Sequence, residues 1–292
     1  MEPNPDFRFV INPNAGRGRS RKCLTGLGEA VDALGGSLYV SESASDLTAF
    51  ARAAVEAGVG RLVAAGGDGT FHHVIQGLAG TACELGMIPL GRGNDLANAL
   101  GVPADWRTAL DRALESPARR IDLGVANGHY YALYCGVGFD SEAGRVANTQ
   151  SFLKGPLAYP YGVLRTLIDF EPPIFNIEYD GGSFEGPAML VNVTNCNRMG
   201  GGMKLTPDAK PDDGRLDMAL GHAMSRLTLL RLFAKIYRGT HVGHPAVTIE
   251  PTKSARIEVD RPLEVNADGE RLFVVYGALE ISVAPGALTV AA

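Results

Sequence analysis

The feature that most constrains the fold is a regular alternation of apolar runs and helical segments over the first 116 residues. Runs typical of buried strands occupy 7–13, 37–43, 61–67 and 85–91. Segments with helical spacing follow them at 23–35, 44–58, 70–80, 94–101 and 105–116. Strands that alternate with helices over short connections predict a parallel, doubly wound sheet covered by helices on both faces.

Beyond residue 120 the pattern changes to short alternating segments separated by Gly, Asn and Asp turns. These segments lie at 120–140, 175–195, 246–259, 263–272 and 279–290. Such a pattern predicts an antiparallel β-sandwich or barrel. Helical spacing interrupts it at 151–170 and at 225–239. We therefore predict an α/β domain over residues 1–122 and a β-sandwich domain over residues 123–292.

The composition narrows the class of protein. Hydrophobic residues make up 46% of the chain and charged residues 20%, as in a soluble globular protein. The net charge of −5 argues against a general nucleic-acid binder. The four cysteines are scattered, which favours neither a disulfide framework nor a zinc site and fits a reducing cytosol. We see no signal peptide and no run that would span a bilayer.

Three loops that follow predicted strands carry unusual residues: "NPNAGRG" (12–18), "GGDGT" (66–70) and "GRGND" (91–95). In doubly wound sheets, ligands bind beyond the carboxyl ends of the strands, where such loops meet. Glycines let the backbone approach a ligand closely, and the amides at a helix N-terminus favour a phosphate. Asp68 stands where a phosphate-bound Mg²⁺ would be expected. Thr70 is a candidate phosphate donor or, alternatively, a helix cap.

Asp95 is a second acid flanked by glycines, and it lies after the fourth predicted strand. Taken alone, Asn94 and Asp95 form a good helix N-cap. If this loop shares a crevice with Asp68, however, Asp95 becomes a candidate for orienting an acceptor hydroxyl.

Several motifs occur together in a specific order: "NPNAG", "GGDGT", "PLGRGND", "GGGMKLTPDAKPDDGRLD" and "NADGE". In this combination the chain resembles the diacylglycerol-kinase-like lipid kinases, a family that includes bacterial lipid kinases and sphingosine kinases. The resemblance extends over nearly the whole chain and is strongest to the soluble bacterial branch. "GGDGT" alone is less specific, because NAD kinases share it.

The resemblance implies an ATP site in the first domain, made of residues from three segments and one arginine. Its residues are Asn12, Pro13, Asn14, Ala15, Gly16, Ser41, Gly66, Gly67, Asp68, Gly69, Thr70, Phe71, His72 and Arg92. Family members commonly carry threonine where Arg92 stands. A guanidinium in that place would reach a phosphate in a different manner.

The resemblance also implies a structural Mg²⁺ in the second domain, with Asp212, the carbonyl of Arg215 and Asp217 as ligands. Carboxylates and carbonyls at a tight turn suit a hard cation, although the same residues would make an ordinary acidic surface turn. Glu270 matches the family's general base, which takes the proton of the acceptor hydroxyl, with Asp268 as its partner. A hairpin at "NADG" explains the turn without catalysis.

These observations predict an ATP- and Mg²⁺-dependent lipid kinase, with Glu270, Asp68 and Asp95 as catalytic residues and a lipid acceptor at the membrane surface. The basic amphipathic segment 225–239 suits an anionic membrane, although packing on the sandwich is the commoner use of such a stripe. We expect a cytoplasmic protein, peripherally associated with membranes. Diacylglycerol, phosphatidylglycerol, a polyprenol and a sphingoid base stay open as acceptors, as does the oligomeric state. The competing functions are an NAD kinase or another small-molecule kinase, and a non-catalytic nucleotide or lipid sensor.

Overall fold

The first half of the chain forms the predicted parallel sheet, as seen in a computed structural model that describes residues 7–150 and 158–292. The strand order is β2–β1–β3–β4, with every pair parallel. The elements are β1 (Phe7–Ile11), η1 (Ala15–Arg17), α1 (Arg19–Ala33), β2 (Leu38–Val40), α2 (Ala44–Glu56), β3 (Arg61–Gly66), α3 (Asp68–Leu78), β4 (Glu84–Pro89), α4 (Asp95–Ala99) and α5 (Trp106–Glu115).

Right-handed crossovers place α1 on one face of this sheet and α2 and α3 on the other. The side chain of Thr48 on α2 donates a hydrogen bond to the carbonyl of His73 on α3. Strands β3 and β4 are apolar along nearly their whole length because both of their faces are covered. This burial makes the sheet a rigid base for the loops at its carboxyl edge.

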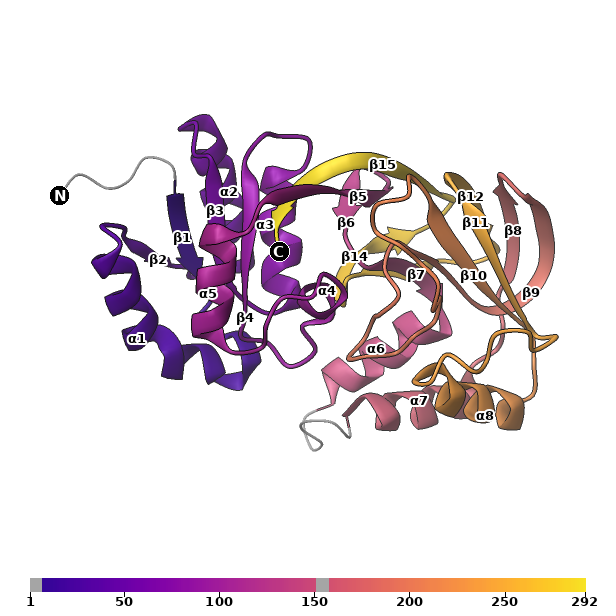
Figure 1. Ribbon diagram of the computed structural model, residues 1–292. Helices are drawn as coiled ribbons and strands as arrows, with labels where there is room; N and C mark the ends of the chain where they lie inside the picture. Colours follow the sequence, from indigo (N-terminus) through magenta and orange to yellow (C-terminus); the bar gives the residue numbers. More distant parts are fainter. Residues whose placement is uncertain (1–6, 151–157) are drawn as a thin grey trace.

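The second half forms an antiparallel sandwich beside the first lobe (Figure 1). Its elements are β5 (Ala118–Ala126), β6 (His129–Tyr131), β7 (Tyr134–Gly138), α6 (Phe139–Thr149), α7 (Ala158–Asp169), β8 (Ile174–Tyr179), β9 (Gly182–Thr194), β10 (Leu216–His222), α8 (Arg226–Ile236), β11 (Val247–Thr252), β12 (Ser254–Val259), β13 (Leu263–Ala267), β14 (Glu270–Val275) and β15 (Ala278–Ala291).

One layer of the sandwich runs β14–β13–β7–β9–β10–β11 and the other contains β8, β12, β15, β5 and β6. The long strand β9 takes part in both layers, since it pairs with β8 along its first half and with β7 and β10 along its second. Phe175, Ile177, Val191, Met218 and Val265 are among the buried residues between the layers. The α/β plus β-sandwich architecture predicted from the sequence is therefore confirmed.

Strand β15 connects the two lobes, which the sequence pattern did not reveal. Its first part pairs with β12, and it pairs with β5 on both sides of an irregularity between Ala284 and Leu288. Its last residues, Val290 and Ala291, pair in parallel with Leu85 and Gly86 of β4. The C-terminus therefore lies in the first lobe, as the yellow ribbon of Figure 1 shows.

The helices of the second lobe differ in part from the prediction. Helix α6 begins at Phe139, directly after β7, where no helix was predicted. The predicted helix 151–170 is observed as α7 from Ala158 to Asp169, and residues 151–157 lie outside the described part of the chain. Helices α6, α7 and α8 share a small apolar cluster that includes Phe139, Val163 and Leu229.

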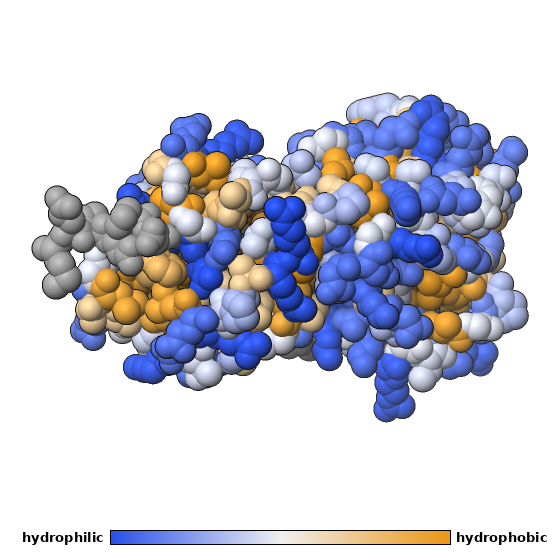
Figure 2. Space-filling view, turned by 45° about the horizontal axis from the view of Figure 1, so that its top comes forward, coloured by the Kyte–Doolittle hydropathy of each residue, from blue (hydrophilic) through white to orange (hydrophobic). Residues whose placement is uncertain are grey.

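Polar and charged residues cover most of the face shown in Figure 2, and the apolar patches on it are separate from one another. Over residues 7–150 and 158–292, no helix combines the length and the apolar character needed to cross a bilayer.

Candidate active site

The three glycine-containing loops meet at the carboxyl edge of the parallel sheet, as predicted. The side-chain amide of Asn12 donates to the hydroxyl of Thr70 at 3.1 Å, which joins the loops after β1 and β3. Arg19, at the start of α1 directly after the first loop, donates to the carbonyl of Gly91 in the loop after β4 at 3.2 Å. A Cβ on Gly16 would lie 2.2 Å from the carbonyl oxygen of Leu90, so only glycine permits this approach.

The residues proposed to hold ATP fall into two groups. Asn12, Pro13, Ala15, Gly16, Gly67, Asp68 and Gly69 are partly accessible, and Asn14 and Arg92 are exposed. Ser41, Gly66, Thr70, Phe71 and His72 are buried. In this second group Phe71 belongs to the main apolar core and Thr70 accepts the hydrogen bond from Asn12. Arg92 makes no hydrogen bond or ion pair with any residue in the described ranges, so its guanidinium is available to a phosphate.

Asp68 begins α3, where the helix N-terminus points toward the loops. Its Oδ1 accepts a hydrogen bond from the amide of Leu96 at 3.1 Å. Burial raises the pKa of Asp68 to about 6, and the neighbouring charge of Asp95 acts in the same direction, against the hydrogen bond from Leu96. Ionising a buried carboxylate costs free energy. A bound cation, or a proton that the carboxylate accepts, removes this cost, so such groups are common at functional sites.

Asp95 lies next to Asp68 across Gly93. A Cβ on Gly93 would lie 3.1 Å from Oδ2 of Asp68 and 3.4 Å from Oδ2 of Asp95. The same oxygen of Asp95 accepts a hydrogen bond of 2.6 Å from the amide of Gly201, in a loop of the second lobe. Burial raises the pKa of Asp95, and the amide donors partly offset this effect. Asp95 therefore forms part of the contact between the lobes, and its side chain does not cap α4.

Glu270 reaches the same place from the second lobe. It begins β14, after the turn that follows β13. A Cβ on Gly69 would lie only 2.4 Å from Oε1 of Glu270, so the carboxylate rests against the backbone next to Asp68. Burial, the largest effect, and the charge of Asp268 raise the pKa of Glu270, whereas His72 lowers it. The glutamate of the second lobe thus lies against Gly69, the residue that directly follows Asp68 in the first lobe.

Asp268 holds the turn that precedes Glu270. Its backbone has φ of 53°, a left-handed conformation that aspartate tolerates in turns. Its two carboxylate oxygens accept hydrogen bonds from the amides of Ala132, Leu133 and Tyr134 at 2.8–3.2 Å. Oδ2 also lies 3.0 Å from Nδ1 of His72 on α3. The ring of His72 therefore lies at the interface between the two lobes.

The predicted structural metal site spans the loop before β10 and the start of β10, where Asp217 lies. Asp212 and Arg215 are exposed and Asp217 is partly buried. Burial and the charges of Asp213 and Asp208 raise the pKa of Asp217. These acidic oxygens suit a hard cation, yet the described residues include no group of three acidic, His or Cys side chains close enough to hold a metal. The ligand set therefore stays a prediction.

Asp122 is a structural residue that the sequence interpretation missed. It is buried, and its carboxylate accepts hydrogen bonds from the amides of Gly214 at 2.6 Å and Gly286 at 2.7 Å. It thereby ties β5 to the acidic loop and to β15. A single acid within the apolar run "IDLGV" was the signal that could have identified it, because buried carboxylates need several donors.

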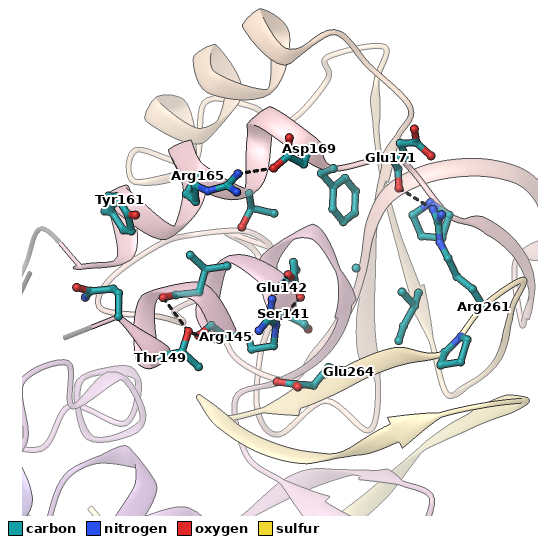
Figure 3. Close-up of a pocket in the computed structure, with 18 residues that line it drawn as sticks. Ser141, Glu142, Arg145, Thr149, Tyr161, Arg165, Asp169, Glu171, Arg261 and Glu264 are labelled. Carbon is teal, nitrogen blue, oxygen red and sulfur yellow. Dashed lines mark hydrogen bonds and ion pairs between the residues drawn. The ribbon is translucent and has the colours of Figure 1, made fainter. Parts of the chain in front are cut away.

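A cavity of about 710 Å³ lies in the second lobe between α6, α7 and the start of β13. Figure 3 shows Arg145 and Arg165 at this cavity, each paired with an acid of its own helix, Glu142 and Asp169. Neither Asp68 nor Glu270 lines it. The cavity is therefore distinct from the candidate active site.

Comparisons with known proteins agree with this arrangement. Residues 6–126 match the family described as "Diacylglycerol kinase catalytic domain", and residues 134–292 match "YegS C-terminal NAD kinase beta sandwich-like domain". Diacylglycerol kinase of Bacillus subtilis (strain 168) is 33% identical over 269 residues, which cover 90% of this chain and 89% of that protein. Diacylglycerol kinase of Staphylococcus aureus (strain MRSA252) is 32% identical over 268 residues, covering 90% and 85%.

A crystal structure from Bacillus anthracis str. Sterne, described as a candidate diacylglycerol kinase, has a TM-score of 0.82 at 26% identity. The similarity covers 98% of this chain and 94% of that one. The two lobes, their loops and the sequence relatives give one answer: the chain belongs to the diacylglycerol kinase family of ATP-dependent lipid kinases.

Proposed function

We propose that the protein transfers the γ-phosphoryl group of ATP to the free hydroxyl of diacylglycerol or a closely related lipid, with Mg²⁺, in the space between the two lobes. One observation carries the proposal. Oε1 of Glu270 lies so close to Gly69 that a Cβ there would be 2.4 Å away, and Gly69 directly follows Asp68. In this proposal the reacting hydroxyl lies between the general base and the phosphate-binding turn.

In this proposal each part of the site has a separate task. The amides around Gly67 and Gly69, at the start of α3, and the guanidinium of Arg92 hold the phosphates. Glu270 accepts the hydroxyl proton as the phosphoryl group leaves ATP. Its raised pKa suits this task, because a carboxylate with a higher proton affinity is a stronger base near neutral pH.

Asp68 and Asp95 are the carboxylates that would hold Mg²⁺ and orient the acceptor. When bound, Mg²⁺ supplies neutralisation of the phosphate charge. The raised pKa of Asp68 fits this role, because burial and the charges of Asp95 and Asp268 disfavour its ionised form, which a bound cation would stabilise. A second Mg²⁺ at Asp212, Arg215 and Asp217 is proposed as structural, and its removal would loosen the loop that Asp122 anchors.

The experiment that tests the function is product identification. Purified protein is incubated with labelled ATP, Mg²⁺ and detergent micelles that contain diacylglycerol, phosphatidylglycerol, a polyprenol or a sphingoid base, and labelled lipids are identified by mass. The expected product is the phosphorylated diacylglycerol. Labelling of NAD but of no lipid would support the small-molecule kinase instead, and ATP binding without any transfer would support the sensor.

We also propose that the protein reaches its lipid acceptor from the surface of an anionic membrane, through α7 and α8. The stripe predicted for membrane contact on α8 is turned inward, since Leu229 and Leu232 are buried. Other apolar side chains face outward: Leu164 is 55% and Ile168 59% exposed, one helical turn apart on α7, and Leu227 is 57% exposed on α8.

Charge favours the same surface. Arg226, Arg231 and Lys235 of α8 are exposed, and α8 contains no acidic residue. Arg226 donates to the carbonyl of Ile168 at 2.6 Å, so the cationic helix lies beside the exposed apolar residues of α7. Apolar side chains flanked by cations are typical of contact with anionic lipid headgroups.

Replacing both Leu164 and Ile168 with serine is expected to weaken binding to vesicles of phosphatidylglycerol and phosphatidylcholine by at least roughly tenfold, because each buried methylene contributes about 0.8 kcal/mol. Vesicle cosedimentation measures the binding. Turnover of a short-chain, water-soluble diacylglycerol should not change. Tyr276→Ser, which removes a 79% exposed side chain outside these helices, is the control. Equal vesicle binding by both variants would contradict this surface.

A further inference from the structure

Helix α3 and the turn between β13 and β14 are joined by a buried pair, His72 and Asp268. Their side chains are 4% and 3% exposed, and Nδ1 of His72 lies 3.0 Å from Oδ2 of Asp268. The two residues are 196 positions apart and belong to different lobes. A buried contact of this kind fixes the distance between the two elements far more firmly than a solvated pair would.

The hydrogen bonds of Asp268 determine which partner donates. Oδ1 accepts from the amides of Leu133 and Tyr134, and Oδ2 accepts from the amide of Ala132. Because both carboxylate oxygens of Asp268 already accept amide hydrogen bonds, this side chain acts as an acceptor toward His72 as well. Nδ1 of His72 therefore carries the hydrogen and donates the hydrogen bond to Oδ2 of Asp268.

Each residue of this pair lies close in the sequence to a residue that we propose takes part in catalysis. His72 lies one helical turn after Asp68 on α3, and Asp268 lies two residues before Glu270. The pKa of His72 is raised: burial, the largest effect, lowers it, but the hydrogen bond and charge of Asp268 and the charge of Glu270 outweigh burial. Glu270 is thus close enough to interact with the ring.

We propose that His72 is a positioning residue: through its hydrogen bond to Asp268 it holds the Glu270 carboxylate against Gly69, at the distance from Asp68 that phosphoryl transfer requires. His72 itself touches neither ATP nor the acceptor. This inference rests on the proposed role of Glu270 and adds the residue that makes that role possible.

The test compares two amides at one position. Asparagine places an N–H donor near the position of Nδ1 of histidine, whereas glutamine places its donor one bond farther along the side chain. His72→Asn should therefore keep the bond to Asp268 and leave kcat within roughly tenfold of wild type. His72→Gln should lower kcat by roughly 10²-fold, the cost of misplacing a catalytic group by about 1 Å. The KM for ATP should stay the same in both variants.

A second comparison separates positioning from a general loss of structure. His72→Leu should lower kcat in the wild-type background but cause no further loss when Glu270 is already glutamine, because the two changes remove one effect. Equal kcat in His72→Asn and His72→Gln, or a full additional loss in the Glu270→Gln background, would overturn the proposal. If Glu270→Gln is fully active, the proposed base is wrong; if it is inactive while His72→Gln is fully active, only this inference fails.

Discussion

Replacing Glu270 with glutamine is expected to lower kcat by about 10²–10⁴-fold, the usual contribution of a general base. Glutamine keeps the size of the side chain and its hydrogen-bonding capacity but cannot take a proton. ATP binding should be unchanged, because the phosphate loops belong to the first lobe. The measurement is steady-state transfer from labelled ATP to diacylglycerol in micelles, together with ATP binding by calorimetry.

Glu250→Gln is the matched control, since Glu250 is exposed on β11. It should leave kcat and the KM for both substrates at wild-type values. A Glu270→Gln protein that is folded and transfers phosphate at the wild-type rate would remove Glu270 from the mechanism.

Replacing Asp68 with asparagine is expected to abolish most turnover and yet to stabilise the fold. The carboxylate has a pKa of about 6 in the folded protein, against 3.8 for the ordinary aspartate. Above that pKa the folded state must ionise this buried carboxylate. Each unit of raised pKa corresponds to about 1.4 kcal/mol, so ionisation lowers the free energy of unfolding by up to about 3 kcal/mol. Asparagine removes the cost and keeps the acceptor for the amide of Leu96.

The pH dependence provides the check. A raised carboxyl pKa means that the folded state binds the proton more tightly than the unfolded state between about pH 4 and 6, so wild-type stability falls as pH rises through that range. Chemical unfolding with EDTA present should therefore show Asp68→Asn more stable than wild type at pH 7, with the two curves converging near pH 4. A variant that is less stable at pH 7 would contradict the cause assigned to the shift. Wild-type turnover should decrease as pH is lowered through about 6.

Much of the first lobe could be predicted from the sequence because its information is local. Apolar runs of strand length, helical spacing and glycine loops each lie within a few residues of one another, and the rule that parallel strands end at one edge brings Asp68 and Asp95 together. Glu270 came from the resemblance rather than from spacing. Its contact with Gly69 joins residues about 200 positions apart, which no periodicity encodes.

The features that were missed depend on long-range pairing. The end of β15 pairs with β4 because the edge of β4 is open in the first sheet. The alternation of residues in 279–290 would suit a strand of either sheet, so it does not predict this pairing. Helix α6 follows β7 without a connecting turn, so its start at Phe139 is set by packing on α7. The roles of Asp122 and Asp268 follow from amides that other segments supply.

The most direct test of the whole account is the activity of Gly69→Ala. Gly69 lies inside α3, where alanine is favoured over glycine, but its Cβ would lie 2.4 Å from Oε1 of Glu270. The flexible end of the glutamate can shift at little cost in stability, so we predict a kcat at least roughly 10²-fold lower with the melting temperature preserved. Gly28→Ala in α1, where a Cβ meets nothing within 4 Å, is the control. Wild-type turnover in Gly69→Ala would show that phosphoryl transfer does not depend on the Glu270 carboxylate standing beside Asp68.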